Sequence, residues 1–196
     1  MLLLFLTVWE LFADFHIIDS FFFSSPSRVV ACFVRMVLER SLFTHIGITL
    51  TETVISFFLV ALVSLSAATL LWYSRRLSEI LEPFLVVLNS LPKSALAPLL
   101  IVWLGTGMDT IIAAGISVAI FGAIINLYTG FLQADPEKLL LIRTLGGTRR
   151  DCFFKVVLPA SIPVILSNMK VNIGLSLVGV VIGEFLAARR GLGYLI

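Results

Sequence analysis

The sequence predicts an all-α protein that crosses a membrane several times. Hydrophobic residues make up 59% of its 196 residues and charged residues only 13%, whereas soluble domains average about 45–50% and about 25%. The apolar residues gather into runs, and a run of roughly 20 helical residues is long enough to cross a bilayer. We expect about five such spans in the chain. Because no fixed repeat or low-complexity linker divides them, residues 1–196 should form one transmembrane domain.

The N-terminal segment combines a short apolar run with an amphipathic helix. Residues 1–13 are too few to cross a bilayer, and we interpret them as the end of a span that begins upstream. A signal peptide is the alternative, although the run lacks a basic start. Aromatic residues at 21–23 predict a turn at the membrane interface. Ser27 is the expected cap of an amphipathic helix over 28–39, which is too charged to cross and should lie externally on the membrane surface or on neighbouring spans.

Four longer apolar runs are the main predicted spans, over 46–72, 84–104, 110–132 and about 162–187. A polar link at 77–82 should separate the first two, with Pro83 opening the second. That second span is interrupted at Leu91 and Pro92, and again at Pro98. Proline frees backbone groups that need partners inside the protein, so this helix should face other protein rather than lipid.

The longest polar stretch of the chain lies between the last two predicted spans. Asp135 is placed to cap a first short helix, which Gly146 would end because a left-handed terminal residue is favourable mainly for glycine. Thr148 and Asp151 form an approximate capping box for a second short helix, and Pro159 should kink the path into the next span. The stretch, residues 135–158, mixes basic and apolar side chains, namely Lys138, Leu139, Leu140, Leu141, Ile142, Arg143, Leu145, Arg149, Arg150, Phe153, Phe154 and Lys155. This mixture predicts a docking element for a soluble partner.

Two motifs in this stretch resemble those of a known family. Residues 143–149 read R-T-L-G-G-T-R and residues 156–163 read V-V-L-P-A-S-I-P, which is similar to the cytoplasmic EAA loop of ABC-transporter permeases in type I, binding-protein-dependent importers. Other motifs fall in the order expected of the nitrate/sulfonate/taurine-type branch: Ser25-Pro26-Ser27, Ser74-Arg75-Arg76, Glu82-Pro83, Leu91-Pro92 and Gly191-Leu192-Gly193-Tyr194-Leu195-Ile196. The chain departs from the motif at Leu140, Leu141 and Ile142, which replace Glu-Ala-Ala and remove its acidic residue.

The resemblance implies the transmembrane subunit of an ATP-driven importer in the bacterial cytoplasmic (inner) membrane. In that family the subunit has six spans and a cytoplasmic coupling helix, and it works as a homodimer by alternating access. Its partners would be an extracytoplasmic solute-binding protein and a separate ABC ATPase dimer, which would hold the ATP and magnesium in place of this chain. The branch handles nitrate, alkanesulfonates, taurine and thiamine-precursor pyrimidines. The residues expected at or beside the ATPase contact are Arg143, Thr144, Leu145, Gly146, Thr148 and Arg149.

Polar residues inside the predicted spans are candidates for the solute path. A polar or ionisable side chain in a span is costly, and it marks either a pathway or a paired structural site. Both interpretations apply to Lys93, Asn168, Asn172 and Ser176, of which the last three share one face of a helix. Lys93 would need a wet cavity or an acid such as Glu82 or Glu52 beside it. Asn126 is expected to form a hydrogen bond between helices.

Catalysis by the chain itself finds no support in the sequence. It has no P-loop of the form GxxxxGK[ST], no nucleophile–base arrangement and no metal-spaced histidines. The glycines at 191 and 193 resemble a phosphate-binding loop only superficially, since no strand precedes them. A formal charge of +2 does not indicate nucleic acid. Two alternatives to a permease remain: a membrane scaffold or assembly protein whose basic loop docks a soluble partner, and a membrane-embedded enzyme.

Overall fold

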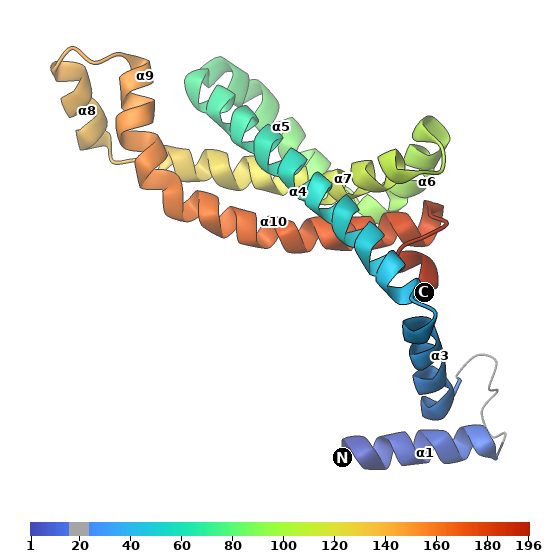
Figure 1. The fold of residues 1–196 in the computed structure, drawn as a ribbon. Helices are drawn as coiled ribbons and strands as arrows, with labels where there is room; N and C mark the ends of the chain where they lie inside the picture. Colours follow the sequence, from blue (N-terminus) through green and yellow to red (C-terminus); the bar gives the residue numbers. More distant parts are fainter. Residues whose placement is uncertain (16–23) are drawn as a thin grey trace. The chain divides into compact units, whose positions relative to one another are not determined.

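The computed structural model describes residues 1–15 and 24–196, and within these ranges every regular element is a helix (Figure 1). Contacts divide the chain into two compact units, residues 1–46 and 47–196, and each unit is described by itself. Residues 21–23 of the predicted interfacial turn lie outside the described residues. The all-α fold class expected from the composition is confirmed.

The first unit contains α1 (Leu2–Asp14) and α3 (Pro26–Leu38). α1 is apolar but has only 13 residues, so by itself it is shorter than a span. α3 is amphipathic, as predicted, and none of its residues is buried. The apolar residues exposed along it are Val29, Val30, Phe33, Val34 and Leu38. Such a stripe is typical of a helix that rests on a lipid surface.

α3 begins two residues earlier than the sequence predicted. The Ser25 hydroxyl accepts a hydrogen bond from the Arg28 backbone N–H (3.4 Å). Pro26 takes the first helical position, where a backbone N–H would have no partner within the helix, so the proline loses no hydrogen bond. Ser27, the expected cap, lies inside the helix and donates its hydroxyl to the Glu10 carboxylate of α1 (2.6 Å). Ser27 therefore joins the two helices of this unit instead of capping one of them.

Among the described residues, three helices are long and apolar enough to cross a membrane: α4 (Ser41–Tyr73), α7 (Met108–Leu132) and the continuous helix Arg149–Ala187. A fourth span results if α5 (Arg75–Ser90) and α6 (Lys93–Leu104) are taken together, although the two are bent by 104° at their break. The remaining predicted span, at the N-terminus, corresponds to the short helix α1 and stays a prediction.

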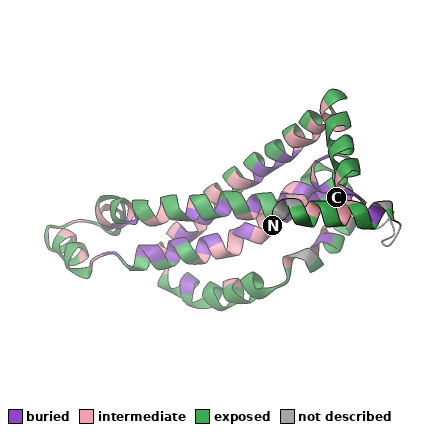
Figure 2. Cartoon of the chain, turned by 90° about the horizontal axis from the view of Figure 1, so that it is seen from below, coloured by how far each residue is buried: buried purple, intermediate pink, exposed green. Residues whose placement is uncertain are grey.

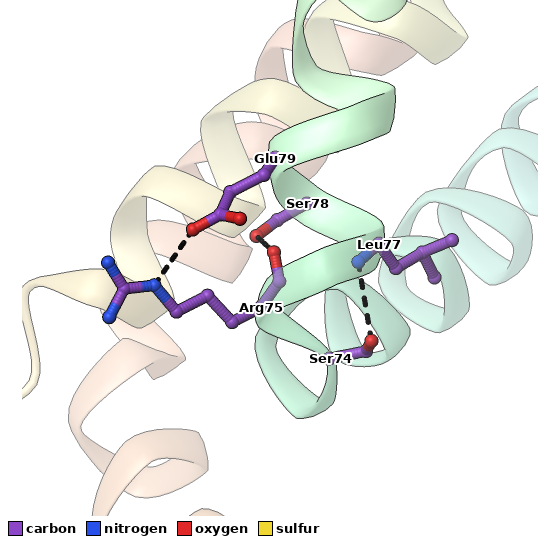
Figure 3. A network of polar contacts seen from close by, with 5 residues as sticks. All are labelled: Ser74, Arg75, Leu77, Ser78 and Glu79. Atoms are coloured by element: carbon purple, nitrogen blue, oxygen red, sulfur yellow. Dashed lines mark hydrogen bonds and ion pairs between the residues drawn. The ribbon is translucent and has the colours of Figure 1, made fainter.

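The polar link predicted at 77–82 is instead part of α5. The Ser74 hydroxyl caps this helix by accepting a hydrogen bond from the Leu77 N–H (3.3 Å), and Arg75 pairs with Glu79 one turn later (2.9 Å), as Figure 3 shows. Pro83 lies inside the helix rather than at its start. The prediction was wrong because a proline removes one backbone hydrogen bond without ending a helix that is capped and packed elsewhere.

The predicted interruption at Leu91 and Pro92 is confirmed. α5 ends at Ser90, Leu91 is extended with ψ 138°, and α6 starts directly after Pro92. Proline disfavours the helical conformation of the residue before it, which explains the break. Pro98, by contrast, lies inside α6 and does not end it.

The second short helix of the loop runs into the last span without a break. α9 (Arg149–Cys152) is followed by a π-helical turn, Phe153–Val157, and then by α10 (Leu158–Ala187). Pro159 therefore lies within a continuous helix, which bends at the π-helical turn (Figure 1). A π-helical turn widens the helix where a proline frees backbone carbonyls, so the expected kink takes this form.

The core of the second unit is the contact between α7 and α10, which lie side by side (Figure 1). The two backbones approach closely at glycines, because a Cβ added to Gly179 would lie 2.8 Å from the Gly115 Cα. Small residues permit such packing where lipid provides no hydrophobic drive. α4 adds Val60, Ala68 and Leu71 to the apolar clusters around this contact, and Figure 2 shows the buried positions along these helices.

Candidate functional site

Both helices of the loop are capped as the sequence predicted. The Asp135 carboxylate accepts a hydrogen bond from the Glu137 N–H (2.9 Å) at the start of α8 (Pro136–Thr144). At the start of α9, the Thr148 hydroxyl accepts from the Asp151 N–H (3.3 Å), and the Asp151 carboxylate accepts from the Thr148 N–H (2.9 Å). The hydrogen bond from the Thr148 hydroxyl also lowers the pKa of Asp151. Asp151 therefore stays ionised, and the capping box stays intact.

A glycine turn joins the two capped helices. The Gly147 N–H donates to the Ile142 carbonyl (2.9 Å) and the Gly146 N–H to the Arg143 carbonyl (3.0 Å), which are the two bonds of a Schellman motif. Gly146 has φ +82°, a conformation that is unfavourable for other residues. The predicted glycine end of the first helix is confirmed, and the turn has a fixed geometry.

An apolar surface points outward from the loop. Leu140, Leu141 and Leu145 are 62%, 57% and 75% exposed, although leucine is usually buried in folded proteins. Arg143 and Thr144, between them in the sequence, are exposed as well. We call the three leucines the leucine patch. An exposed apolar patch on a rigid support is typical of a surface that a partner protein covers.

Arg149 binds the end of α4. Its guanidinium donates to the Trp72 carbonyl (3.1 Å) and lies 5.5 Å from the centre of the Trp72 ring. The rings of Trp72, Tyr73 and Phe153 contact one another in edge-to-face or tilted arrangements. Their centres are 5.3 Å apart for Trp72–Tyr73, 5.2 Å for Trp72–Phe153 and 5.4 Å for Tyr73–Phe153. α9 and the π-helical turn are therefore joined to the end of α4.

The predicted path residues of α10 lie on its buried face. Asn168, Asn172 and Ser176 are 5%, 2% and 0% exposed, and Asn168 and Asn172 line a cavity of about 270 Å³ between α4 and α10. The Asn168 amide donates to the Ala123 carbonyl (3.4 Å), while the Asn168 carbonyl oxygen and the Ser176 hydroxyl have no hydrogen-bond partner within the described part of the chain. A buried polar atom without a partner costs about 1–3 kcal/mol, so both atoms are energetically unfavourable where they lie.

A second cavity, of about 460 Å³, opens between α7 and α10. The polar side chains that line it are Asn126, Thr129, Gln133, Ser167 and Asn168. Asn126 is exposed there. This corrects the expectation that its side chain forms a hydrogen bond to another helix. Thr129 and Gln133 were not singled out from the sequence, although their spacing from Asn126 is that of one helix face. Asn168 lines both cavities.

Lys93 lies apart from these residues. Its ammonium group donates to the Leu88 carbonyl and lies 5.1 Å from the centre of the Phe121 ring. No ion pair with Glu82 or Glu52 is found within residues 1–15 and 24–196. The structure therefore does not bring Lys93 together with Asn168.

The fold combines spans packed through small residues, a capped loop with exposed leucines, and polar cavities beside the last span, as a membrane transport subunit would. The chain belongs to the family described as binding-protein-dependent transport system inner membrane component, whose model matches residues 60–196. It is a permease subunit of an ABC importer for a small solute, in the nitrate/sulfonate/taurine-type branch.

Curated relatives and a solved structure agree with this assignment. The formylaminopyrimidine transport permease protein ThiX of Halalkalibacterium halodurans is 27% identical, over 98% of this chain and 76% of its own length. The putative aliphatic sulfonates transport permease protein SsuC of Bacillus subtilis is 28% identical, over 97% and 69%. The inward-facing MetNI methionine ABC transporter matches with a TM-score of 0.71 at 19% identity, over 81% of this chain and 79% of that one. This last likeness shows the fold.

Proposed function

We propose that the chain works as a homodimer in the bacterial inner membrane and carries its solute by alternating access. A separate ABC ATPase dimer would drive it, holding the ATP and magnesium, and an extracytoplasmic solute-binding protein would deliver the solute. The family description, an inner membrane component of binding-protein-dependent transport, supports this membrane and these partners. The names of the relatives support a solute that is a small sulfonate-like anion or a pyrimidine.

The leucine patch on its capped loop is the observation that carries this proposal. An ATPase groove would cover the patch together with Arg143, Thr144, Gly146 and Thr148. The loop can transmit a movement of the ATPase to the spans, because both of its helices are capped and the turn between them is hydrogen-bonded. α9 continues into α10, and Arg149 bonds it to α4. Closure of the ATPase dimer would therefore tilt both spans and open the path.

The proposed solute path runs along the two cavities that Asn168 lines. Polar side chains exposed to lipid are costly in a membrane helix, so Asn126, Thr129 and Gln133 favour a water-filled passage along α7. Asn172 and Ser176 would extend this path when the helices move. Lys93 is not included, because its ammonium group lies over Phe121.

Copurification tests the proposed docking. A tagged permease should bring down an ATPase in about equal amount, as expected of a stable interface, whereas a scaffold or an enzyme should not. Leu145→Asp should reduce the recovered ATPase at least about tenfold, because it places a charge in the middle of an apolar contact. Leu145→Met is the matched control and should retain it. Full recovery with Leu145→Asp would count against the leucine patch as the docking surface.

Replacing Arg149 by alanine should weaken the connection between the loop and α4. A hydrogen bond from a charged group and a cation–π contact together contribute about 2–3 kcal/mol, so we expect ATP-driven uptake to fall at least about fivefold while the ATPase stays bound. Arg150→Ala is the matched control, since Arg150 lies 5.6 Å from the Phe154 ring of its own helix. Uptake into proteoliposomes is measured for both variants. An equal loss of uptake in the two would contradict the role of Arg149 in joining the loop to α4.

A further inference from the structure

Among the described residues, no charged side chain lines either of the two cavities beside α10. The larger cavity, of about 460 Å³, has the usual size of a small-molecule site. Three amides and two hydroxyls form its polar lining, from Asn126, Thr129, Gln133, Ser167 and Asn168. The smaller cavity is apolar apart from Ser64, Asn168 and Asn172. Both cavities are therefore polar without being charged.

Such a lining offers little to an anion. Proteins usually bind carboxylate, phosphate and similar oxyanions through arginine, lysine or several free backbone N–H groups. The other residues that line the larger cavity lie inside α7 or α10, where backbone N–H groups are already bonded within the helix. A sulfonate in this cavity would lose its water without gaining a cation, which is strongly unfavourable in a membrane interior. The ammonium group of taurine would add a second charge without a partner.

The two lysines that the predicted spans contain lie outside both cavities. Lys170 is exposed and follows Asn168 by two residues, about 200° around α10, and it does not line either cavity. Lys93 donates to the Leu88 carbonyl and lies over the Phe121 ring. Neither lysine therefore supplies the positive charge that an anion would need.

Asn168 indicates which groups the solute should carry. Its amide nitrogen donates to the Ala123 carbonyl (3.4 Å). A carbonyl only accepts hydrogen bonds, so this contact fixes the orientation of the amide. The amide oxygen is left without a partner in the described part of the chain, and it can only accept. It therefore matches an N–H or O–H group of the solute, which nitrate and the sulfonate group do not have.

We propose that the path selects an uncharged solute with both hydrogen-bond donors and acceptors, such as a pyrimidine, over sulfonate-like anions. This selectivity rests on the proposed function, because it acts on the solute that the permease carries. Asn126 and Gln133 would donate to ring nitrogens and accept from amino groups, and Asn168 would accept a further hydrogen bond. Since Asn168 is buried, its oxygen would bind the solute when the cavities widen during alternating access.

Uptake by the intact complex of permease, ATPase and solute-binding protein tests the solute class in proteoliposomes. The probes are formylaminopyrimidine, which is uncharged and has N–H donors, and methanesulfonate, an anion with acceptor oxygens only. Formylaminopyrimidine should enter at least about tenfold faster, because a site built for hydrogen bonds rejects a molecule that leaves them unmade. Equal or faster uptake of methanesulfonate would overturn the selectivity.

ATP hydrolysis, measured on the same vesicles, separates failure of this selectivity from failure of the proposed function. If hydrolysis responds to the binding protein but neither probe enters, the solute class is wrong and the transport function stands. If hydrolysis does not respond to the binding protein, the proposed function itself is contradicted.

Binding to the permease–ATPase complex without the binding protein shows what the permease itself selects. A ligand that binds the folded state raises its Tm. At matched ionic strength, an excess of formylaminopyrimidine should raise the Tm by about 2 °C or more, and methanesulfonate should leave it unchanged. Stabilisation by methanesulfonate alone, or by neither probe, would show that the permease has no such preference.

Three variants locate this binding in the larger cavity. Asn126→Leu removes an exposed amide from the lining and should abolish the Tm shift, whereas Lys170→Gln is the matched control on α10 and should retain it. Gln133→Lys adds a cation at the end of α7 and should let methanesulfonate stabilise the complex. A shift that survives Asn126→Leu, a shift that Lys170→Gln abolishes, or a Gln133→Lys complex that still ignores methanesulfonate would each contradict the proposal.

Discussion

Replacing Gly179 by leucine is expected to prevent assembly of a stable bundle. A Cβ at this position would lie 2.8 Å from the Gly115 Cα and 2.9 Å from the Ala114 carbonyl oxygen. Both are backbone atoms, so α7 and α10 would have to separate along the core contact of the second unit. Overpacking against backbone costs about 3 kcal/mol or more, which corresponds to at least a hundredfold shift in the folding equilibrium at about 1.4 kcal/mol per tenfold.

The amount of folded protein measures this effect. Fluorescence-detected size-exclusion chromatography of the detergent-solubilised permease should show the monodisperse peak nearly lost for Gly179→Leu. Gly174→Ala is the matched control on the same helix, because nothing lies within 4 Å of a Cβ added there. That variant should retain the peak, and its stability should increase slightly, because alanine is about 1 kcal/mol more favourable than glycine in a helix. A normal peak for Gly179→Leu would disprove the close contact of α7 and α10.

Replacing Gly146 by valine is expected to uncouple transport while leaving the bundle folded. Gly146 has φ +82°, where a side chain costs about 1–2 kcal/mol and a β-branched one is disfavoured further. Nothing lies within 4 Å of a Cβ added at Gly146, so the effect comes from the backbone conformation alone. Loss of the Schellman turn would leave α8 and the leucine patch without a fixed orientation.

Uptake and ATP hydrolysis, measured together in proteoliposomes, distinguish uncoupling from misfolding. Gly146→Val should lower uptake at least about tenfold, which is the change that a free-energy difference of about 1.4 kcal/mol produces. The extracted permease should stay monodisperse. Gly146→Asn is the matched control, because asparagine adopts left-handed conformations more readily than other residues with a side chain. It should retain most of the uptake. Undiminished uptake with Gly146→Val would show that the turn does not couple the two subunits.

The loop was predicted from the sequence almost in full. Asp135, Gly146 and Thr148 each act on backbone groups within four residues of themselves, so residue type and spacing decide their hydrogen bonds. Prolines were harder to interpret. Pro92 breaks a helix and Pro83 does not, because the outcome depends on caps and packing partners that lie elsewhere in the chain.

The candidate path was predicted only in part. Asn168 was singled out because a polar residue in a span is costly, but its cavities also need Asn126, Thr129 and Gln133 from another helix. Lys93 met the same criterion and lies elsewhere, over Phe121. A sequence shows which polar residues a span contains, but it does not show which helices face each other.

The sequence alone determined that this is an all-α membrane protein, where its longest spans lie, and how its loop is capped, since these features depend on composition and on partners a few residues apart. Only the tertiary structure brought Arg149 to Trp72, 77 residues away, and Thr49 to Glu184, 135 residues away. The physical reason is that such contacts depend on how close α4, α7 and α10 approach. That distance is set by small residues packing against backbone, and the sequence does not show which helix each small residue faces.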